Sequence, residues 1–299
     1  MTDNSRYGYR SLTGGRMTRF AVAFALISVV AACSTRGPDS RAERRTGQCA
    51  FQVCIQALPG SQSLVYMARN ETVVPATVRL HFERIRNLES SDPDTVFRIV
   101  PAGQSEVLTR LWPVDPEEGI RVRPVVTVDL GNDSAVHRPP EPYALPFGGT
   151  EPRQLVSGYG GPTHLNENHY ALDFGMPEGT PILAARAGVV AYVQDGFTRG
   201  GLTPDLIERA NLVVVGHDDG TLASYGHLRE GIPVAPGDVV ERGQLLGWSG
   251  STGFSGQPHL HFHVGKRMMG GENRTIPVEF EVEAVEGGWY GPGVELEAP

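Results

Sequence analysis

The chain has 299 residues and a formal net charge of −8, and its 37 glycines and 23 prolines are spread along it. This acidic balance, without a dense group of basic residues, argues against a nucleic-acid partner, because phosphates must be neutralised by lysine and arginine. The length exceeds that of one small domain and predicts two domains after any targeting segment.

Residues 1–33 are typical of a targeting segment. Residues 20–32 form an apolar run of thirteen residues, and Val30-Ala31-Ala32 precede Cys33. Such a run is too short to span a bilayer and predicts a secretory signal, for which Met17 is a candidate true start. The small residues before the cysteine resemble the lipobox of bacterial lipoproteins, which implies cleavage before Cys33 and its lipidation. An ordinary cleaved signal is the alternative.

Residues 34–47 are polar and without periodicity, so we expect a flexible tether. Cys49 and Cys54 follow it closely. In an exported protein two neighbouring cysteines are more often paired than free, and we therefore expect a local disulfide between them. A metal site is the weaker interpretation, because the next histidine is His81.

Residues 48–135 contain short runs of β-branched and apolar residues separated by turn residues. Polar and apolar positions alternate in residues 76–82, as in a strand with one solvated face, and similar runs lie at 63–68, 96–100 and 122–128. These runs predict a small β-sandwich-like domain whose function is not evident.

Residues 136–153 are rich in proline and predict an extended linker. We expect a second all-β domain over 154–282 and a tail over 283–299. Residues 195–210 interrupt the strands with a loop and one short helix that begins at Thr203-Pro204. That loop is a candidate wall of a substrate groove.

Three blocks in the second domain carry its chemistry. Residues 257–264 place His259, His261 and His263 at alternate positions of a predicted strand, so the three imidazoles share one face. A row of imidazoles favours a metal or proton-transfer site, although solvent-facing histidines are the simpler alternative. The other blocks are residues 164–174, with two histidines and an aspartate, and residues 223–228, which include His227.

These blocks, in this order, resemble the lysostaphin or LytM-type zinc endopeptidases that cut peptide cross-links in bacterial cell walls. Further matches lie at 179–190, 217–220, 237–244 and 250–253, so the resemblance spans about 154–282. It implies a β-sheet or barrel-like peptidase domain, of the duplicated hybrid motif type, that binds one Zn²⁺ per chain.

The resemblance implies that Asp173, His261 and one upstream histidine bind the metal. His169 has the usual spacing from Asp173, whereas His164 lies nine residues before it. An extended chain between His169 and Asp173 would span about 13 Å, too far for both to reach one ion, unless the chain turns there. The residues alone leave both histidines open as ligands.

The resemblance also assigns His227 and His259 to catalysis beside the metal. One would accept a proton from the attacking water, and the other would stabilise the oxyanion or protonate the leaving amine. His263 stands where relatives often carry glutamate, and we expect it to lie beside the ligands or to face solvent rather than to bind the metal.

Together these features predict a lipid-anchored zinc endopeptidase of peptidoglycan. The expected substrate is the D-alanine to meso-diaminopimelate cross-link. The expected location is the periplasmic side of a bacterial membrane, with the outer membrane favoured over the inner membrane. The expected partners are peptidoglycan stem peptides and the membrane that holds the lipid. The sequence does not decide whether a protein regulator also binds. The chief alternative is a non-catalytic LytM-like module that binds peptidoglycan or activates an amidase.

Overall fold

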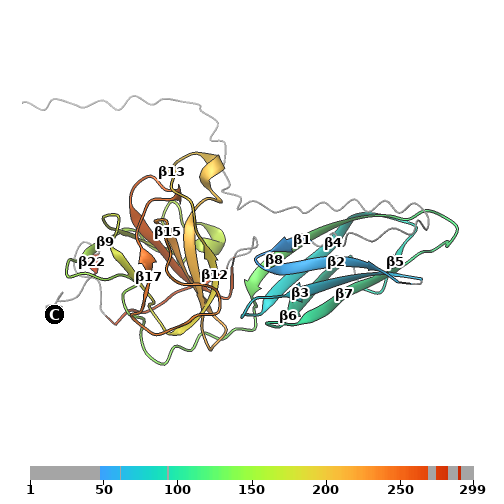
Figure 1. Ribbon diagram of the computed structural model, residues 1–299, viewed down its shortest axis with the longest axis horizontal. Coiled ribbons are helices and arrows are strands. Elements are labelled where there is room, and N and C mark those ends of the chain that lie inside the picture. The colour runs from blue at the N-terminus through green and yellow to red at the C-terminus, as the bar shows by residue number, and fades with distance from the viewer. Residues whose placement is uncertain (1–47, 61, 93, 269–273, 282–288, 291–299) are drawn as a thin grey trace, which may run out of the picture.

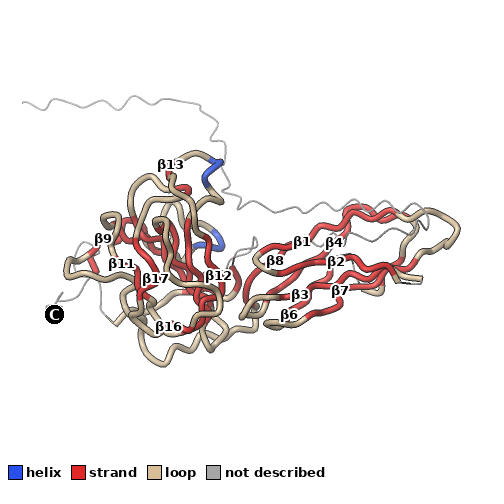
Figure 2. Tube along the Cα trace, in the orientation of Figure 1, coloured by secondary structure: helices blue, strands red, loops and turns tan. Residues whose placement is uncertain are grey.

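The computed structural model describes residues 48–60, 62–92, 94–268, 274–281 and 289–290. The predicted signal, Cys33 and the tether lie outside these residues. The described chain is almost entirely β-structure, with two short 3-10 helices, which confirms the predicted fold class (Figures 1 and 2). No helix in the described ranges is long and apolar enough to cross a membrane.

The N-terminal part forms two antiparallel sheets. One has the order β1-β2-β3-β7-β5, and the other contains β8-β4-β6. The strand bounds are β1 Gln48–Ala50, β2 Val53–Pro59, β3 Leu64–Asn70, β4 Ala76–Arg86, β5 Glu89–Ser90, β6 Thr95–Val100, β7 Ser105–Trp112 and β8 Arg121–Gly131.

Alternation along these strands explains the sandwich. On β4 the side chains of Ala76, Val78 and Leu80 are fully buried, whereas those of Arg79 and His81 point to the other, partly solvated face. The inward-facing side chains of both sheets therefore form one shared apolar core. The predicted β-sandwich-like arrangement follows from this period of two.

A disulfide closes the first hairpin. Cys49 and Cys54 are directly opposite in the β1–β2 pair, with Cα atoms 4.0 Å apart, and their sulfur atoms are bonded. Phe51 and Gln52 both have positive φ, as the tight turns that join twisted antiparallel strands require. The turn places the Phe51 ring edge-on to Tyr192 of the second body, with ring centroids 5.6 Å apart.

The second body is built on a sheet of nine strands with the order β16-β12-β14-β15-β19-β10-β9-β22, and β21 pairs with β19. Two small ladders, β11–β17 and β13–β18, complete it. The bounds are β9 Arg153–Ser157, η1 Asn166–Asn168, β10 Leu172–Gly175, β11 Pro181–Leu183, β12 Gly188–Gln194, β13 Gly200–Gly201, η2 Pro204–Leu206, β14 Asn211–Gly216, β15 Leu222–Leu228, β16 Val239–Val240, β17 Leu245–Trp248, β18 Gly253–Phe254, β19 His259–Gly265, β20 Arg267–Met268, β21 Thr275–Ile276 and β22 Trp289–Tyr290.

Both faces of the large sheet are covered in its middle. Val213 and Val215 of β14 enter the core of the second body, and Val214 packs on the opposite face in a smaller cluster with Leu130 and Met268. A strand buried on both faces loses the polar alternation, which is why β14 contains three consecutive valines. The sandwich therefore packs against the face of the sheet that bears Val214.

The two bodies also share a sheet. β20, from the second body, pairs with β8 and so extends the sheet β8-β4-β6 of the sandwich. Arg267 of β20 is buried there and its guanidinium lies 3.6 Å from Asp129 and 3.2 Å from Asp133. Sequence patterning did not predict the pairing of β20 with the sandwich sheet, because a two-residue strand is too short to show a period.

Two further features differ from the expected outline. The short helix expected over 203–210 is a single 3-10 turn at Pro204–Leu206, and the Thr203 side chain makes no capping hydrogen bond. Trp289–Tyr290, in the expected tail, pairs with β9 at the edge of the large sheet.

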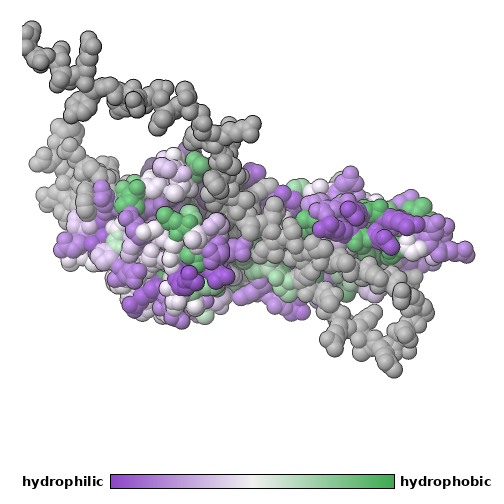
Figure 3. Space-filling model, turned by 90° about the horizontal axis from the view of Figure 1, so that it is seen from above, coloured by the Kyte–Doolittle hydropathy of each residue, from purple (hydrophilic) through white to green (hydrophobic). Residues whose placement is uncertain are grey.

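On the face seen in Figure 3 the surface is mostly hydrophilic, with small separate groups of hydrophobic residues.

A buried polar cluster attaches the linker to the second body. The guanidinium of Arg186 bonds both Asp218 and Asp219, and the Asp219 carboxylate also accepts the backbone N–H of Arg138. Beside it, His217 Nδ1 donates to the Ala187 carbonyl at 2.9 Å and the ring meets Tyr143 edge-on. Burial lowers the pKa of His217 to about 4.

The lowered pKa of His217 predicts a loss of stability in acid. The unfolded chain binds this proton more readily than the folded protein, so stability is complete above pH 6.5 and decreases as the pH falls towards 4. The linked free energy is about 2–3 kcal/mol. In urea unfolding at pH 7.5 and 4.5, His217→Gln should lose less stability than wild type by about that amount. His169→Gln, at an exposed position, is the control; equal losses in all three proteins would contradict the assignment.

Candidate metal centre and active site

Strand β19 places its histidines in a row along one face of the sheet. The register with β15 sets Gly265 opposite Leu222, His263 opposite Ser224 and His261 opposite Gly226. Leu222 belongs to the cluster under the sandwich, so this face runs from the interface, through His263 and His261, to His259 at its outer end. The predicted common face of the three imidazoles is confirmed.

The neighbouring strand β10 supplies a carboxylate at the same level. Asp173 is paired directly with His261, and directly paired residues carry their side chains on the same face, within reach of each other. Asp173 Oδ1 lies 2.7 Å from His261 Nδ1 and 3.8 Å from His259 Nε2. Gly226, on the other side of His261, has no side chain to crowd the ring.

The loop before β10 brings His164, and not His169, to this carboxylate. The 3-10 turn Asn166–Asn168 reverses the chain, so His164 doubles back and its Nε2 lies 3.1 Å from Asp173 Oδ2. His169 is exposed and packs against Tyr170, with ring centroids 4.7 Å apart, and against the turn at Gly160. The structure therefore separates the two histidines that the sequence left open.

The hydrogen bonds of His164 show which of its ring nitrogens carries a proton, and they indicate that a cation would stabilise the cluster. Nδ1 of His164 donates to the Gly158 carbonyl at 2.9 Å, which leaves a lone pair on Nε2. That Nε2 is buried without a hydrogen-bond partner and faces the carboxylate of Asp173. Two electron-rich atoms held this close are stabilised by a positive charge between them, either a proton or a metal ion.

The same atoms suit zinc. One ligand atom from each of His164, Asp173 and His261 lies within 4.8 Å of the others. Imidazole nitrogen and carboxylate oxygen are preferred zinc ligands, and a catalytic zinc has three protein ligands and one open position. These three residues fit such a site.

The charges in the cluster support each other. Burial opposes ionisation of Asp173, but the imidazoles of His164 and His261 outweigh it and lower the pKa of the carboxyl group. Burial also opposes protonation of His164, but the Asp173 carboxylate outweighs it and raises the pKa of that imidazole. The carboxylate is thus ionised at neutral pH and attracts a cation to this position.

His263 orients His261, one of the three candidate metal ligands. Its Nδ1 lies 3.1 Å from His261 Nε2, and burial lowers its pKa well below the usual range, so it is neutral. If His261 uses Nδ1 for a metal, its Nε2 carries the proton and donates it to His263 Nδ1. Since the His263 side chain is buried, the alternative that it faces solvent is wrong.

His227 reaches the site through a β-bulge. In the β14–β15 pair, Leu212 is opposite Gly226 and Asn211 is opposite Leu228, so His227 has no partner and adopts a φ of 62°. A non-glycine residue in this left-handed region is strained, and bulges commonly redirect a side chain near a functional site. The bulge turns His227 towards β19, where its ring lies 4.6 Å from the ring of His259.

Main-chain carbonyls hold both non-ligand histidines. Nδ1 of His227 donates to Thr252 at 2.7 Å, and Nδ1 of His259 donates to Gln257 at 2.8 Å. Each Nε2 is therefore left with a lone pair. Burial, with the neighbouring histidines, lowers the pKa of His227 to about 3, and burial lowers the pKa of His259. Both rings are neutral at neutral pH and can accept protons.

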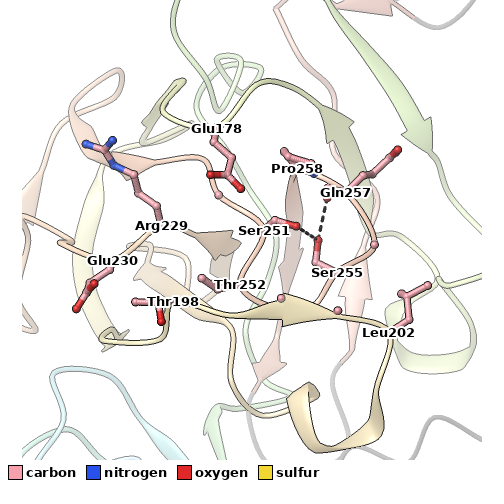
Figure 4. Close-up of a pocket in the computed structure, with 14 residues that line it drawn as sticks. Glu178, Thr198, Leu202, Arg229, Glu230, Ser251, Thr252, Ser255, Gln257 and Pro258 are labelled. Carbon is pink, nitrogen blue, oxygen red and sulfur yellow. Dashed lines mark hydrogen bonds between the residues drawn. The ribbon is translucent and has the colours of Figure 1, made fainter.

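A groove of about 850 Å³ is lined by residues on the turns that hold these two histidines (Figure 4). Thr252 and Gln257, whose carbonyls hold the rings, also line the groove. The expected loop forms its other wall, because β13 pairs with β18 and places Thr198 to Leu202 along the opening. The turns that position the histidines thus also shape the space next to them.

Known proteins share this part of the chain. Residues 167–274 match the model of peptidase family M23. The glycyl-glycine endopeptidase ALE-1 of Staphylococcus capitis is 43% identical over 112 residues, and the peptidoglycan DD-endopeptidase ShyA of Vibrio cholerae is 36% identical over 96 residues. The matches cover 35% and 32% of this chain, and 28% and 20% of those two proteins. This chain contains a peptidase family M23 domain.

A solved M23 structure is similar to part of this chain. The catalytic domain of the prophage-encoded M23 protein EnpA from Enterococcus faecalis, in a mutant form, is 30% identical, and the match covers 45% of this chain and 94% of that one, with a TM-score of 0.34. The residues that match the M23 family model lie in the second body, and this chain spans less than a third of the length of ALE-1 or ShyA.

Sequence reasoning did not find the groups that orient the site. The carbonyls of Gly158, Thr252 and Gln257 carry no side-chain signature, and the bulge at His227 appears only when β14 and β15 are paired. The sequence did indicate that His263 shares a strand face with His261. Its burial could not be predicted, because it results from tertiary packing around β19.

Metal binding should distinguish the two upstream histidines. His261→Ala and His164→Ala each remove one of three ligands, so zinc affinity should fall by at least about 100-fold, a loss of the kind seen when metal sites are altered. His169→Ala is the matched control in the same loop and should bind zinc as wild type does. Stoichiometry after dialysis and competition with a chromophoric chelator measure this. Full zinc binding by His164→Ala, or its loss in His169→Ala, would show that the ligand set is wrong.

Proposed function

We propose that this chain is a zinc-dependent endopeptidase that hydrolyses peptide cross-links of bacterial peptidoglycan, with the D-alanine to meso-diaminopimelate bond as its substrate. The observation that carries the proposal is the arrangement of the M23 cluster. Three ligand atoms converge on one point, and two neutral histidines lie next to them with free Nε2 lone pairs. Such an arrangement is suited to hydrolysis of an amide bond.

The relatives support the reaction class. The names of ALE-1 and ShyA describe endopeptidases, one of glycyl-glycine bonds and one of peptidoglycan. The choice of the D-alanine to meso-diaminopimelate bond rests on the predicted export signal, because a periplasm implies that type of cross-link.

The residues present would divide the chemistry among themselves. His164, Asp173 and His261 would hold zinc, which supplies a Lewis acid that polarises the scissile carbonyl and makes water more acidic. Nε2 of the neutral His259, 3.8 Å from Asp173 Oδ1, is placed to accept a proton from the attacking water. His227, held behind it by Thr252, would stabilise the oxyanion or protonate the leaving amine only after its free Nε2 has taken up the proton that the attacking water releases.

The alternative is a non-catalytic module that uses the groove to hold wall peptides or to activate an amidase. A binding module has no need for a buried carboxylate between two imidazoles, nor for a strained His227 beside them. The complete set of five groups, His164, Asp173, His227, His259 and His261, favours the enzyme.

Removal of either non-ligand histidine should separate chemistry from metal binding. His227→Ala and His259→Ala should keep one zinc per chain, because neither is in the ligand set, and should lose about 10²-fold or more in kcat, the usual scale for an acid-base or oxyanion group. Cross-linked muropeptides with wild type should yield uncross-linked peptides and no sugar fragments, as chromatography with mass spectrometry detects. Pure, zinc-loaded wild type that leaves every cross-link intact would favour the binding module.

We further propose that the chain is exported and held on the periplasmic side of a bacterial membrane by lipid on Cys33. The support is the sequence of Val30-Ala31-Ala32-Cys33 after a short apolar run. Cys33→Ser should abolish acylation and release a soluble or unprocessed protein, because stable anchoring needs several acyl chains. Mass spectrometry of the mature N-terminus measures the result; a mature protein that begins elsewhere without acyl chains would refute the anchor.

A further inference from the structure

Four arginines lie together on the outer face of one sheet of the sandwich. In the pairing of β4 with β8, Arg84 is directly opposite Arg123 and Arg86 is directly opposite Arg121. Directly paired residues carry their side chains on the same face, so the four guanidinium groups form one group, which we call the arginine cluster. Val122 lies between two of them on β8 and enters the apolar core, so the arginine cluster points away from that core.

The charge of the arginine cluster is not balanced on this face. Glu83, at the bulge of β4, lies 3.0 Å from Arg123. Within the described residues, Arg84, Arg86 and Arg121 take part in no ion pair, and all three are exposed. Like charges directly opposite each other destabilise a sheet. An anionic ligand on this face would remove that repulsion.

Exposed apolar side chains continue the same face. Phe97 and Ile99, on the edge strand β6, are 52% and 49% exposed. Phe97 is paired with Arg79 of β4, whose guanidinium lies 5.4 Å from the centre of the Phe97 ring. Arg79 is in turn paired with Thr127 of β8, which alternates in step with Arg123, so these side chains lie on the outer face with the arginine cluster. Arginine next to exposed aromatic and branched side chains is typical of surfaces that bind the headgroup region of a membrane.

Acidic residues mark the end of this face. The loop before β8 carries Asp115, Glu117 and Glu118. The Asn87 side chain, one residue after β4, holds this loop by donating to the carbonyls of Asp115 and Glu118. The loop therefore lies at the end of the sandwich that is distant from the second body, where Figure 1 shows β5. This end would repel an anionic surface, so such a surface would approach the sheet from its outer face.

The sandwich is the part of the chain that follows the predicted lipid anchor. The described chain begins at Gln48, in β1 of the sandwich, and residues 34–47 separate it from Cys33. These fourteen residues can span at most about 50 Å. If Cys33 carries lipid, the sandwich stays within that distance of the bilayer. An anionic phospholipid surface would then be within reach of the arginine cluster.

We propose that the outer face of β8, β4 and β6 docks on an anionic phospholipid membrane. Phosphate groups of the lipids pair with Arg84, Arg86 and Arg121, and the side chains of Phe97 and Ile99 enter the headgroup region. This inference goes beyond the endopeptidase function and does not depend on it. The acyl chains of the proposed anchor would keep the protein at the membrane, and the docked face would fix the orientation of the sandwich there.

The physical basis is multivalent contact between guanidinium and phosphate groups. A guanidinium forms two parallel hydrogen bonds with a phosphate, and it is more weakly hydrated than an ammonium group. Each arginine held near an anionic surface should increase membrane binding by about fivefold at low salt. The contribution of the arginines decreases as salt rises, because exposed charges are screened, whereas the apolar contribution of Phe97 does not.

Vesicle binding by the unacylated protein tests the docking face without the anchor. The protein is the chain from Ser34 onward, which retains every described residue. Arg86→Gln/Arg121→Gln removes one directly opposed pair. The matched control is Arg69→Gln/Arg110→Gln, since Arg69 and Arg110 are exposed on the other sheet of the sandwich and both double variants have the same net charge. Thermal unfolding checks that each variant is folded.

Flotation measures binding to vesicles of phosphatidylcholine with about one third phosphatidylglycerol, and vesicles of phosphatidylcholine alone are the neutral probe. Wild type and the matched control should bind the anionic vesicles at low salt, and Arg86→Gln/Arg121→Gln should bind them about 20- to 30-fold more weakly. Phe97→Ser should weaken binding at low and high salt alike.

Three results would overturn the proposal. Equal losses in the two double variants would show that only net charge matters, and unchanged binding by Arg86→Gln/Arg121→Gln, or equal binding of wild type to neutral vesicles, would show that the arginine cluster does not dock. Binding of wild type to a polyglutamate peptide, without binding to anionic vesicles, would identify a protein-binding face instead. Muropeptide cleavage and acylation of Cys33 are measured in separate assays, so failure of the proposed endopeptidase or anchor would leave a positive vesicle result standing.

Discussion

The carboxylate of Asp173, held between the imidazoles of His164 and His261, is the interaction on which the rest of the M23 site depends. A largely buried carboxylate without a partner would cost several kcal/mol, so the surrounding strands must supply positive charge at this point. They do so through register. A shift of one residue between β10 and β19 would turn His261 to the other face of the sheet and leave Asp173 unpaired.

The same constraint explains the irregular parts of the site. A regular strand β15 would carry His227 on the face opposite to Gly226, away from the candidate metal ligands. The unpaired position and the positive φ of His227 break the alternation at that residue alone, and the Thr252 carbonyl then fixes the ring. Conformational strain at His227 thus brings its side chain to the face of the sheet that Gly226 also faces.

The two bodies of the protein are coupled through this sheet. The interface cluster, which includes Leu222 and Met268, lies on the face of the sheet that carries the histidines, and β20 extends the sandwich sheet directly after β19 ends. His263 lies between the interface and the candidate metal ligands, and its neutral ring orients His261. The sandwich and the histidine–aspartate cluster therefore divide one face of the large sheet between them, and Gln257 and Pro258, just before His259, line the groove.

Local pattern in the sequence determined the all-β class, the strand that carries three histidines on one face and the cysteines close enough to pair, because each depends on spacing along a few residues. Asp173, His227, His259 and His261 were also predicted as site residues from sequence, through the resemblance to a family. Only tertiary structure placed His164 rather than His169 beside Asp173, since that choice depends on a turn at residues 166–168 and on the Gly158 carbonyl. The bulge at His227, the burial of His263 and the exchange of β20 likewise arise from pairing between distant segments, which no local period encodes.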